Sequence, residues 1–144
     1  MPGQPEDHLD YVARLRTEPP EHVDELARTV IGAAIDVHRR LGPGFLESVY
    51  ESALVIELTR RRIRFEQQRV ISIEYEGVRI GEHRLDLLVG DELVVELKAT
   101  DGIAPIHVAQ LLSYLRAGAF QLGLLLNFNV PYLRYGIRRV VNTL

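Results

Sequence analysis

The sequence predicts an α/β domain in which a mixed sheet is flanked by helices. Two observations predict this fold class. Apolar residues recur with helical spacing in some segments and with a period of two in others. One helical segment stands between two strands, which is typical of a parallel crossover connection. The 144 residues, 47% hydrophobic and 26% charged, suit a single domain with a sizeable core.

The expected elements follow the order α-α-β-β-β-α-β-β. Helical spacing covers residues 21–40, with acids in the first turn and arginines in the last, and Gly42-Pro43-Gly44 ends that helix. A second helix is expected over residues 46–62, and Pro105 opens the third. The apolar stripe of the second helix consists of Val49, Ala53, Leu54 and Leu58. The expected strands are 70–75, 78–89, 93–99, 122–128 and 133–141.

Composition excludes several functional classes. The chain has no cysteine, which rules out disulfides, thiol nucleophiles, cysteine-bound zinc and iron–sulfur clusters. No apolar run approaches the roughly 20 residues needed to cross a bilayer, so no membrane association is expected. The acidic, proline-containing start does not have the pattern of a signal peptide, and we expect a cytoplasmic protein.

Charge divides the chain into an acidic start and a weakly basic body. Residues 1–25 contain seven acids and two arginines, whereas the remainder contains 15 basic and 13 acidic residues. We expect an N-terminal arm over residues 1–20 and a single domain over 21–144. The charge of this domain is compatible with a polyanionic partner but does not require one.

The only lysine among the 17 basic residues, Lys98, lies in an expected strand with Glu96. Side chains two residues apart share a face of a strand, so these two point the same way. If Gly90-Asp91-Glu92 is a three-residue loop, Val89 pairs with Leu93 and Asp86 stands opposite Glu96, with Cβ atoms about 5 Å apart. Two carboxylates in apolar surroundings need a compensating positive charge. Hard oxygen ligands favour Mg²⁺ or Mn²⁺, with the lysine beside the ion.

Asp86, Glu96 and Lys98 also fit a purely structural alternative, a salt-bridged pair on a solvated face of the sheet. E-x-K is common in strands of charged chains. On the three residues alone the salt-bridged pair is favoured, and the position of the only lysine brings the two interpretations nearly level.

The order of short motifs along the chain resembles the PD-(D/E)xK nuclease superfamily. Asp86 and Glu96-Leu97-Lys98 lie on adjacent expected strands, and a helix bearing Gln110-x-x-x-Tyr114 follows. Within the superfamily, Gly44-x-x-Glu47-x-x-Tyr50 resembles the heptapeptide of the bacterial GxxExxY family. The resemblance covers residues 23–141 and implies a restriction-endonuclease-like core of α-β-β-β-α-β.

The resemblance also implies roles for individual residues. Asp86 and Glu96 would bind the metal with the backbone carbonyl of Leu97, and Lys98 would activate water and meet the developing negative charge. Glu47 resembles a helix-borne acid near the metal, although a first-turn acid facing the positive helix end is an equal alternative. Gln110 and Tyr114 share a helical face and would position Lys98 or a phosphate, or Tyr114 packs in the core.

Arginines mark two further candidate regions. Arg60, Arg61, Arg62 and Arg64 could follow a nucleic-acid backbone, as could Arg134, Arg138 and Arg139, whereas a solvated helix end explains the first group equally well. We found no aromatic interleaving that would predict a stacking platform for single strands. His107 is interpreted as a surface or capping histidine.

Taken with the resemblance, the residues predict a nuclease that depends on Mg²⁺ or Mn²⁺ and hydrolyses phosphodiester bonds, with DNA as the expected substrate. The alternative is a non-catalytic interaction or regulatory module that keeps the nuclease fold. A glycosidase-type acid pair is disfavoured by Lys98 and by the lack of sugar-stacking aromatics nearby. Whether a homodimer or a partner protein completes the molecule stays open.

Overall fold

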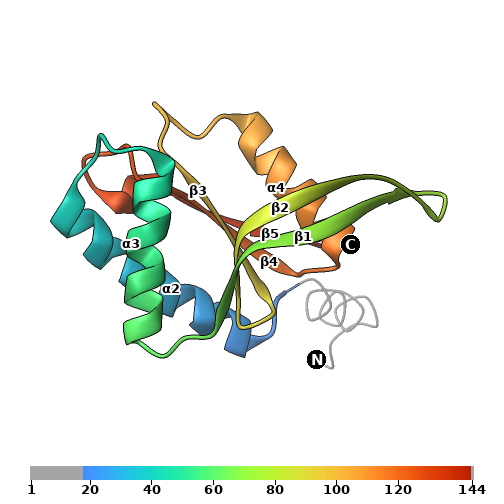
Figure 1. The fold of residues 1–144 in the computed structure, drawn as a ribbon, viewed down its shortest axis with the longest axis horizontal. Helices are drawn as coiled ribbons and strands as arrows, with labels where there is room; N and C mark the ends of the chain where they lie inside the picture. Colours follow the sequence, from blue (N-terminus) through green and yellow to red (C-terminus); the bar gives the residue numbers. More distant parts are fainter. Residues whose placement is uncertain (1–17, 144) are drawn as a thin grey trace, which may run out of the picture.

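The computed structural model of the chain describes residues 18–143, so residues 1–17 of the expected arm lie outside the described part. The described residues form a five-stranded sheet with helices on both sides (Figure 1). In chain order the elements are α2 (Glu21–Leu41), α3 (Glu47–Arg60), β1 (Phe65–Tyr75), β2 (Val78–Val89), β3 (Leu93–Lys98), α4 (Pro105–Gly118), β4 (Leu122–Asn127), η1 (Leu133–Gly136) and β5 (Ile137–Val141).

The sheet is mixed, as the sequence predicts. The strand order is β1-β2-β3-β4-β5, and only β3 and β4, which α4 connects, run parallel. The other neighbours are antiparallel. Val89 pairs with Leu93 across a three-residue turn, so the expected register between β2 and β3 is confirmed. The α-β-β-β-α-β core predicted for the domain is therefore present.

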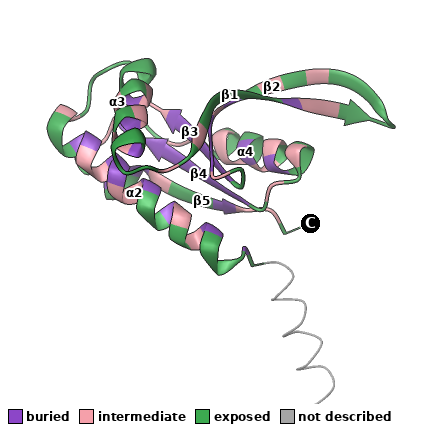
Figure 2. Ribbon diagram, turned by 60° about the horizontal axis from the view of Figure 1, so that its bottom comes forward, coloured by how far each residue is buried: buried purple, intermediate pink, exposed green. Residues whose placement is uncertain are grey.

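Two hydrophobic cores lie on opposite faces of the sheet. The larger core packs α2 and α3 against β3 and β4 and contains Val95, Leu97 and Leu124. The smaller core packs α4 against the other face and contains Val94, Leu111 and Leu125. Figure 2 shows β3 and β4 buried between these layers, whereas the β1–β2 ribbon projects beyond them and is largely exposed.

The structure corrects three details of the predicted elements. Residues 133–136 form the 3₁₀ turn η1, and only 137–141 continue as a strand. The strand β1 begins at Phe65, five residues before the expected start. In α3 the buried stripe is Tyr50, Leu54 and Leu58, while Val49 is exposed, because the face that meets the sheet is rotated by one residue from the predicted one. No helix in the described part is long and apolar enough to cross a membrane.

Candidate active site

The loop before α3 fixes the position of Glu47, the first residue of that helix. Gly42 and Gly44 have φ angles of 66° and 111°, which favour glycine and allow the sharp turn. Tyr50 is fully buried, and its hydroxyl donates to the Gly42 carbonyl at 2.6 Å and accepts from the Phe45 amide at 3.1 Å. The tyrosine thus ties the loop to the helix.

Asp86 lies where β2 and β3 stop pairing. The register runs through Leu87 opposite Val95, and the next position on β2 is Asp86. Its Oδ2 accepts a hydrogen bond from the Leu97 amide at 2.9 Å, in the middle of the Glu96-Leu97-Lys98 segment. A side chain therefore replaces a ladder bond at this point and holds the Asp86 carboxylate against β3.

Glu96 points toward α4 from the middle of the sheet. It shares a face with Val94 of the smaller core and is only 6% exposed. Its Oε1 lies 3.5 Å from His83 Nε2, and both atoms are buried without a hydrogen-bond partner. The His83 ring stacks on Tyr114 of α4, with centroids 3.6 Å apart and an interplanar angle of 9°.

A small cavity of about 40 Å³ joins these residues to the rest of α4. Glu96, His83 and Tyr114 line it together with Lys98, Gln110 and His107. The Nδ1 of His107 accepts a hydrogen bond from the Ala104 amide, so His107 caps α4 as expected. The structure therefore brings Glu96, Lys98, Gln110 and Tyr114 to one point, with Asp86 on the adjoining strand.

The charges in this cluster influence one another strongly. Burial, and then the charge of Asp86, raises the pKa of Glu96 to about 9, so this carboxyl is protonated at neutral pH. Burial and Asp86 also raise the pKa values of Glu47 and Glu51, while Lys98 lowers that of Glu47. These effects locate the start of α3 within electrostatic reach of Asp86 and Lys98. Four carboxyl groups thus share a region with one lysine.

Burial also shifts the pKa values of His83 and Tyr114. Desolvation lowers the pKa of His83, with Asp86 acting in the opposite direction. Desolvation and then Glu96 raise the pKa of Tyr114. At neutral pH both rings are therefore uncharged beside the protonated Glu96, which is how the unpaired atoms are tolerated in this apolar environment.

The donor set fits a hard divalent cation. Among residues 18–143, no group of three or more His, Asp or Glu side chains is arranged to hold a metal as it stands. Mg²⁺, however, commonly takes one or two carboxylates and keeps several waters. Asp86 and Glu96 supply two carboxyl groups. The Oε1 of Glu96 is buried without a hydrogen-bond partner and is therefore available as a metal ligand. These residues match that chemistry.

Two members of the cluster, Glu51 and His83, are absent from the sequence prediction. Glu51 lies one turn after Glu47 and accepts hydrogen bonds from Gln67 and Gln68. The i, i+4 spacing of Glu47 and Glu51 could have indicated a shared face. His83 is three residues from Asp86, a spacing that strict alternation would put on opposite faces of a strand.

A backbone irregularity explains why His83 joins the cluster. The pairing of β1 with β2 passes from Gln67–Leu87 to Arg69–Leu85, and Gln68 between them has a φ of 54°. Leu85 accordingly packs in the smaller core although Leu87 packs in the larger one. No pattern of residue types in β2 predicts that Leu85 and Leu87 lie on opposite faces of the sheet.

The arginine run after α3 is not part of the cluster. The 14-residue helix separates it from Glu47 by about 20 Å. Arg61 forms ion pairs with Asp36 and Glu57, and Arg64 pairs with Asp91. Within the described part of the chain, the side chains of Arg60 and Arg62 have no such partner.

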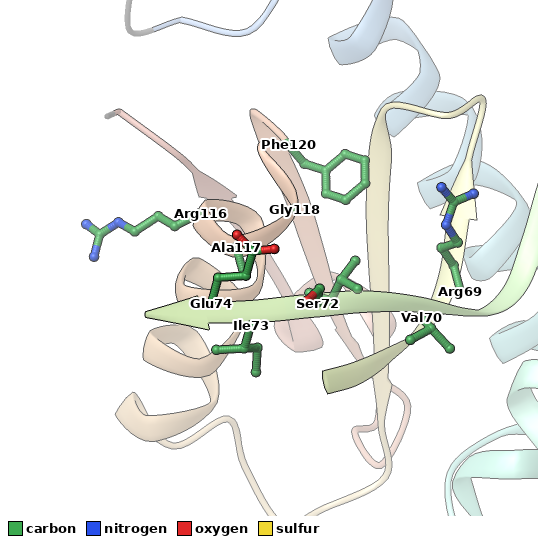
Figure 3. A pocket seen from close by; sticks show the side chains of 10 residues that line it. Arg69, Val70, Ser72, Ile73, Glu74, Arg116, Ala117, Gly118 and Phe120 are labelled. Atoms are coloured by element: carbon green, nitrogen blue, oxygen red, sulfur yellow. The ribbon is translucent and has the colours of Figure 1, made fainter. Parts of the chain in front are cut away.

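A wider hollow of about 680 Å³ lies between β1 and the end of α4, away from the acid cluster. Figure 3 shows Glu74 directed toward Ala117 at the end of α4, whereas Arg69 stands at the other end of this strand segment, away from α4, and Val70 and Ile73 lie on the opposite side of the strand from Glu74. Glu74 is its only carboxylate, and it includes none of the clustered groups. Titratable groups converge in the smaller cavity, and that cavity is the candidate site.

The sheet order and the acid–lysine cluster define the class first: a restriction-endonuclease-like α/β domain. A family model described as the PD-(D/E)XK nuclease superfamily matches residues 24–140, and the chain belongs to this superfamily. Nucleases of the superfamily generally use divalent metals. Neither the comparison with curated proteins nor that with solved structures gives a significant match.

Proposed function

We propose that this protein is a divalent-metal-dependent nuclease that hydrolyses phosphodiester bonds of nucleic acid, with DNA as the substrate. The observation that carries the proposal is the meeting of Asp86, Glu96 and Lys98 at the point where β2 and β3 separate. The match to the nuclease superfamily over residues 24–140 supports it. We also assign the chain to the GxxExxY branch, on Gly44, Glu47 and Tyr50.

In this proposal, Asp86, Glu96 and the Leu97 carbonyl would hold Mg²⁺ or Mn²⁺. The chemistry that such a bound ion supplies is polarisation of a phosphoryl oxygen and a lowered pKa of a bound water. To hold the ion, Glu96 would have to be deprotonated, since only the carboxylate is a ligand. Its location at the buried end of the site keeps bulk water from competing for that ligand atom.

The other residues act on the water and the phosphate. The Lys98 ammonium meets the negative charge that develops on the phosphoryl oxygens, where a compact charge is most effective. Glu47, exposed at the start of α3, accepts the proton of the attacking water, whose oxygen bonds to phosphorus as the bond to the leaving sugar oxygen breaks. The leaving oxygen takes a proton from solvent. Gln110 and Tyr114 position Lys98 and the phosphate.

Nucleic-acid contacts beyond the reacting phosphate are proposed for only part of the arginine run. Arg60 and Arg62 are exposed and have no ion pair in the described part of the chain, so they are free to contact phosphates far from the site. Arg61 and Arg64 are held by acids of the same chain. We therefore expect their substitution to affect stability before binding.

Metal titration and cleavage on the same samples test the proposal. Calorimetry with Mn²⁺ and Mg²⁺ should detect binding to the unaltered protein and to Lys98→Ala, but not to Asp86→Ala or Glu96→Ala. All three variants should lose plasmid cleavage by roughly 10²-fold or more. Asp101→Ala, an exposed acid outside the cluster, is the matched control. Metal binding that survives alanine at both Asp86 and Glu96 would refute the site.

One observation favours the second candidate function, a non-catalytic module that keeps the fold. The ligand groups are not preassembled, and Glu96 is protonated at neutral pH. Absence of any metal binding at pH 8, with an intact fold, would support that candidate. Metal binding without cleavage of plasmid or RNA would instead indicate that another macromolecule delivers the substrate.

A further inference from the structure

An exposed cluster of two tyrosines and one arginine lies on η1, the turn that follows β4. Tyr132 and Tyr135 are 62% and 63% exposed, and their rings meet edge to face at 6.3 Å. The Arg134 guanidinium lies 5.2 Å and 4.9 Å from the two ring centroids and donates a hydrogen bond to the Tyr135 hydroxyl at 3.1 Å. These three side chains form one exposed cluster of mutual contacts.

The backbone under this cluster is fixed. Leu133 is buried in the larger core, between the exposed neighbours. Gly136 approaches β4 so closely that an added Cβ would lie 2.1 Å from the Asn127 carbonyl oxygen. Tyr132 and Tyr135 are therefore presented on a rigid support, which lowers the entropy cost of binding a ligand.

A cavity of about 200 Å³ opens beside Tyr132, between η1 and the end of α2. Arg39 and Arg134 both line it; Arg39 is exposed on α2 although it forms an ion pair with Asp36 at 3.6 Å. His38 Nε2 donates a hydrogen bond to the Val130 carbonyl at 2.8 Å, and His38 forms one side of the cavity. The complete lining is Ile35, His38, Arg39, Tyr132, Leu133 and Arg134. An aromatic wall between two guanidinium groups suits a planar base that carries a phosphate.

The cluster lies within a few nucleotides of the candidate active site. The Phe128 amide donates a hydrogen bond to the Lys98 carbonyl at 2.9 Å, so the chain that follows β4 starts beside the lysine backbone. Tyr132 follows four residues later, which limits the separation of the Phe128 and Tyr132 Cα atoms to about 14 Å. Because Lys98 lines the cavity on the α4 side whereas η1 packs against α2, a strand whose phosphate lies at Lys98 would pass around the end of β3 and β4 to reach η1.

We infer that Tyr132, Arg134 and Tyr135, with Arg39, form a subsite for an unpaired nucleotide of the substrate strand. A base stacks on Tyr132 over the cavity, and the two arginines meet its phosphate. The inference deepens the proposed function by naming single-stranded segments as the substrate class. It differs from the sequence-based expectation, which found no aromatic interleaving that supports a stacking platform for single strands.

Binding measured without metal tests the subsite separately from catalysis. Fluorescence anisotropy in EDTA would compare labelled oligothymidine, oligouridine and a duplex of equal length. Tyr132→Ala should weaken binding of the single strands by about tenfold, and Tyr132→Phe should retain it, because the stacking surface remains. Tyr75→Ala, an equally exposed tyrosine on the β1–β2 ribbon, is the matched control and should bind as the unaltered protein does. Comparison of the thymidine and uridine strands identifies DNA or RNA as the source of the base.

Several outcomes would overturn the inference. These are equal losses for Tyr132→Ala and Tyr75→Ala, equal weakening of duplex and single strand, or no binding of either single strand by the unaltered protein. Manganese-dependent cleavage of the same strands is recorded in parallel. Cleavage that Tyr132→Ala leaves unchanged contradicts the subsite but not the nuclease, whereas Tyr132-dependent binding without cleavage contradicts the nuclease but not the subsite.

Discussion

The two faces of the central sheet differ in the polarity that they bury. On the side of α2 and α3, β3 contributes Val95 and Leu97 to an apolar core. On the side of α4, the alternate residues of the same strand are Val94, Glu96 and Lys98, and the last two line the cavity of the candidate site. One short strand therefore serves stability with one face and chemistry with the other, because its side chains alternate.

The largest effect that would test this comparison concerns Glu96. Its pKa is raised from 4.5 to about 9 in the folded protein. The folded state therefore binds this proton more tightly, and the stability it contributes is complete below pH 4.5 and is lost as the pH rises through 9. In metal-free buffer, the unaltered protein should lose on the order of 5 kcal/mol over this window relative to Glu96→Gln.

Urea unfolding of both proteins at several pH values measures this difference. Glu96→Gln removes the titrating group but keeps its shape, so every other pH effect is shared and cancels. Asp101→Asn serves as the control for loss of an exposed acid. Parallel stability profiles for the unaltered protein and Glu96→Gln would contradict a raised pKa of Glu96 in the folded protein.

The opposite face should respond to loss of volume instead of pH. Phe128 is fully buried in the larger core and stacks on Tyr50 with centroids 4.5 Å apart. Phe128→Ala should lower the free energy of unfolding by about 3–5 kcal/mol at any pH at which the protein folds. Ile80→Ala, on the exposed ribbon, should change it by no more than about 0.5 kcal/mol. Similar costs for the two variants in urea unfolding would contradict the assignment of the core.

Most of the fold could be predicted because its signals are local. Helical spacing and period-two alternation indicated α2, α4 and β2, and the turn Gly90-Asp91-Glu92 set the register of β3. The conversion of residues 133–136 into a 3₁₀ turn was missed, since it depends on the close approach of Gly136 to the end of β4. That contact joins η1 to the end of β4 and leaves no trace in the apolar pattern.

The candidate site divides in the same way. Glu96 and Lys98 are two residues apart in a strand, so their common face followed from spacing alone. The position of His83 is accompanied by the gap in the β1–β2 ladder at Gln68, whose φ is positive. The electrostatic repulsion between Glu51 and Asp86 depends on how α3 crosses the sheet. The stacking cluster on η1 depends on the 3₁₀ turn that brings Tyr132 and Tyr135 to Arg134. Tertiary packing determines each of these, and the sequence pattern does not encode it locally.

The smallest predicted effect connects the two faces through Tyr50. Its ring belongs to the larger core, while its hydroxyl holds the loop that presents Glu47. Tyr50→Phe keeps the stacking on Phe128 but leaves the Gly42 carbonyl and the Phe45 amide without that partner. The free energy of unfolding should fall by about 1–2 kcal/mol, and cleavage should fall because Glu47 is less well held.

Metal affinity separates the two consequences of this variant. Asp86 and Glu96 do not contact Tyr50, so calorimetric Mn²⁺ binding by Tyr50→Phe should match that of the unaltered protein. Tyr75→Phe, which alters an exposed hydroxyl on the β1–β2 ribbon, is the control and should leave stability, binding and cleavage unchanged. Weaker Mn²⁺ binding by Tyr50→Phe would mean that the loop before α3 shapes the metal site itself, and the division of labour between the two faces would then be incomplete.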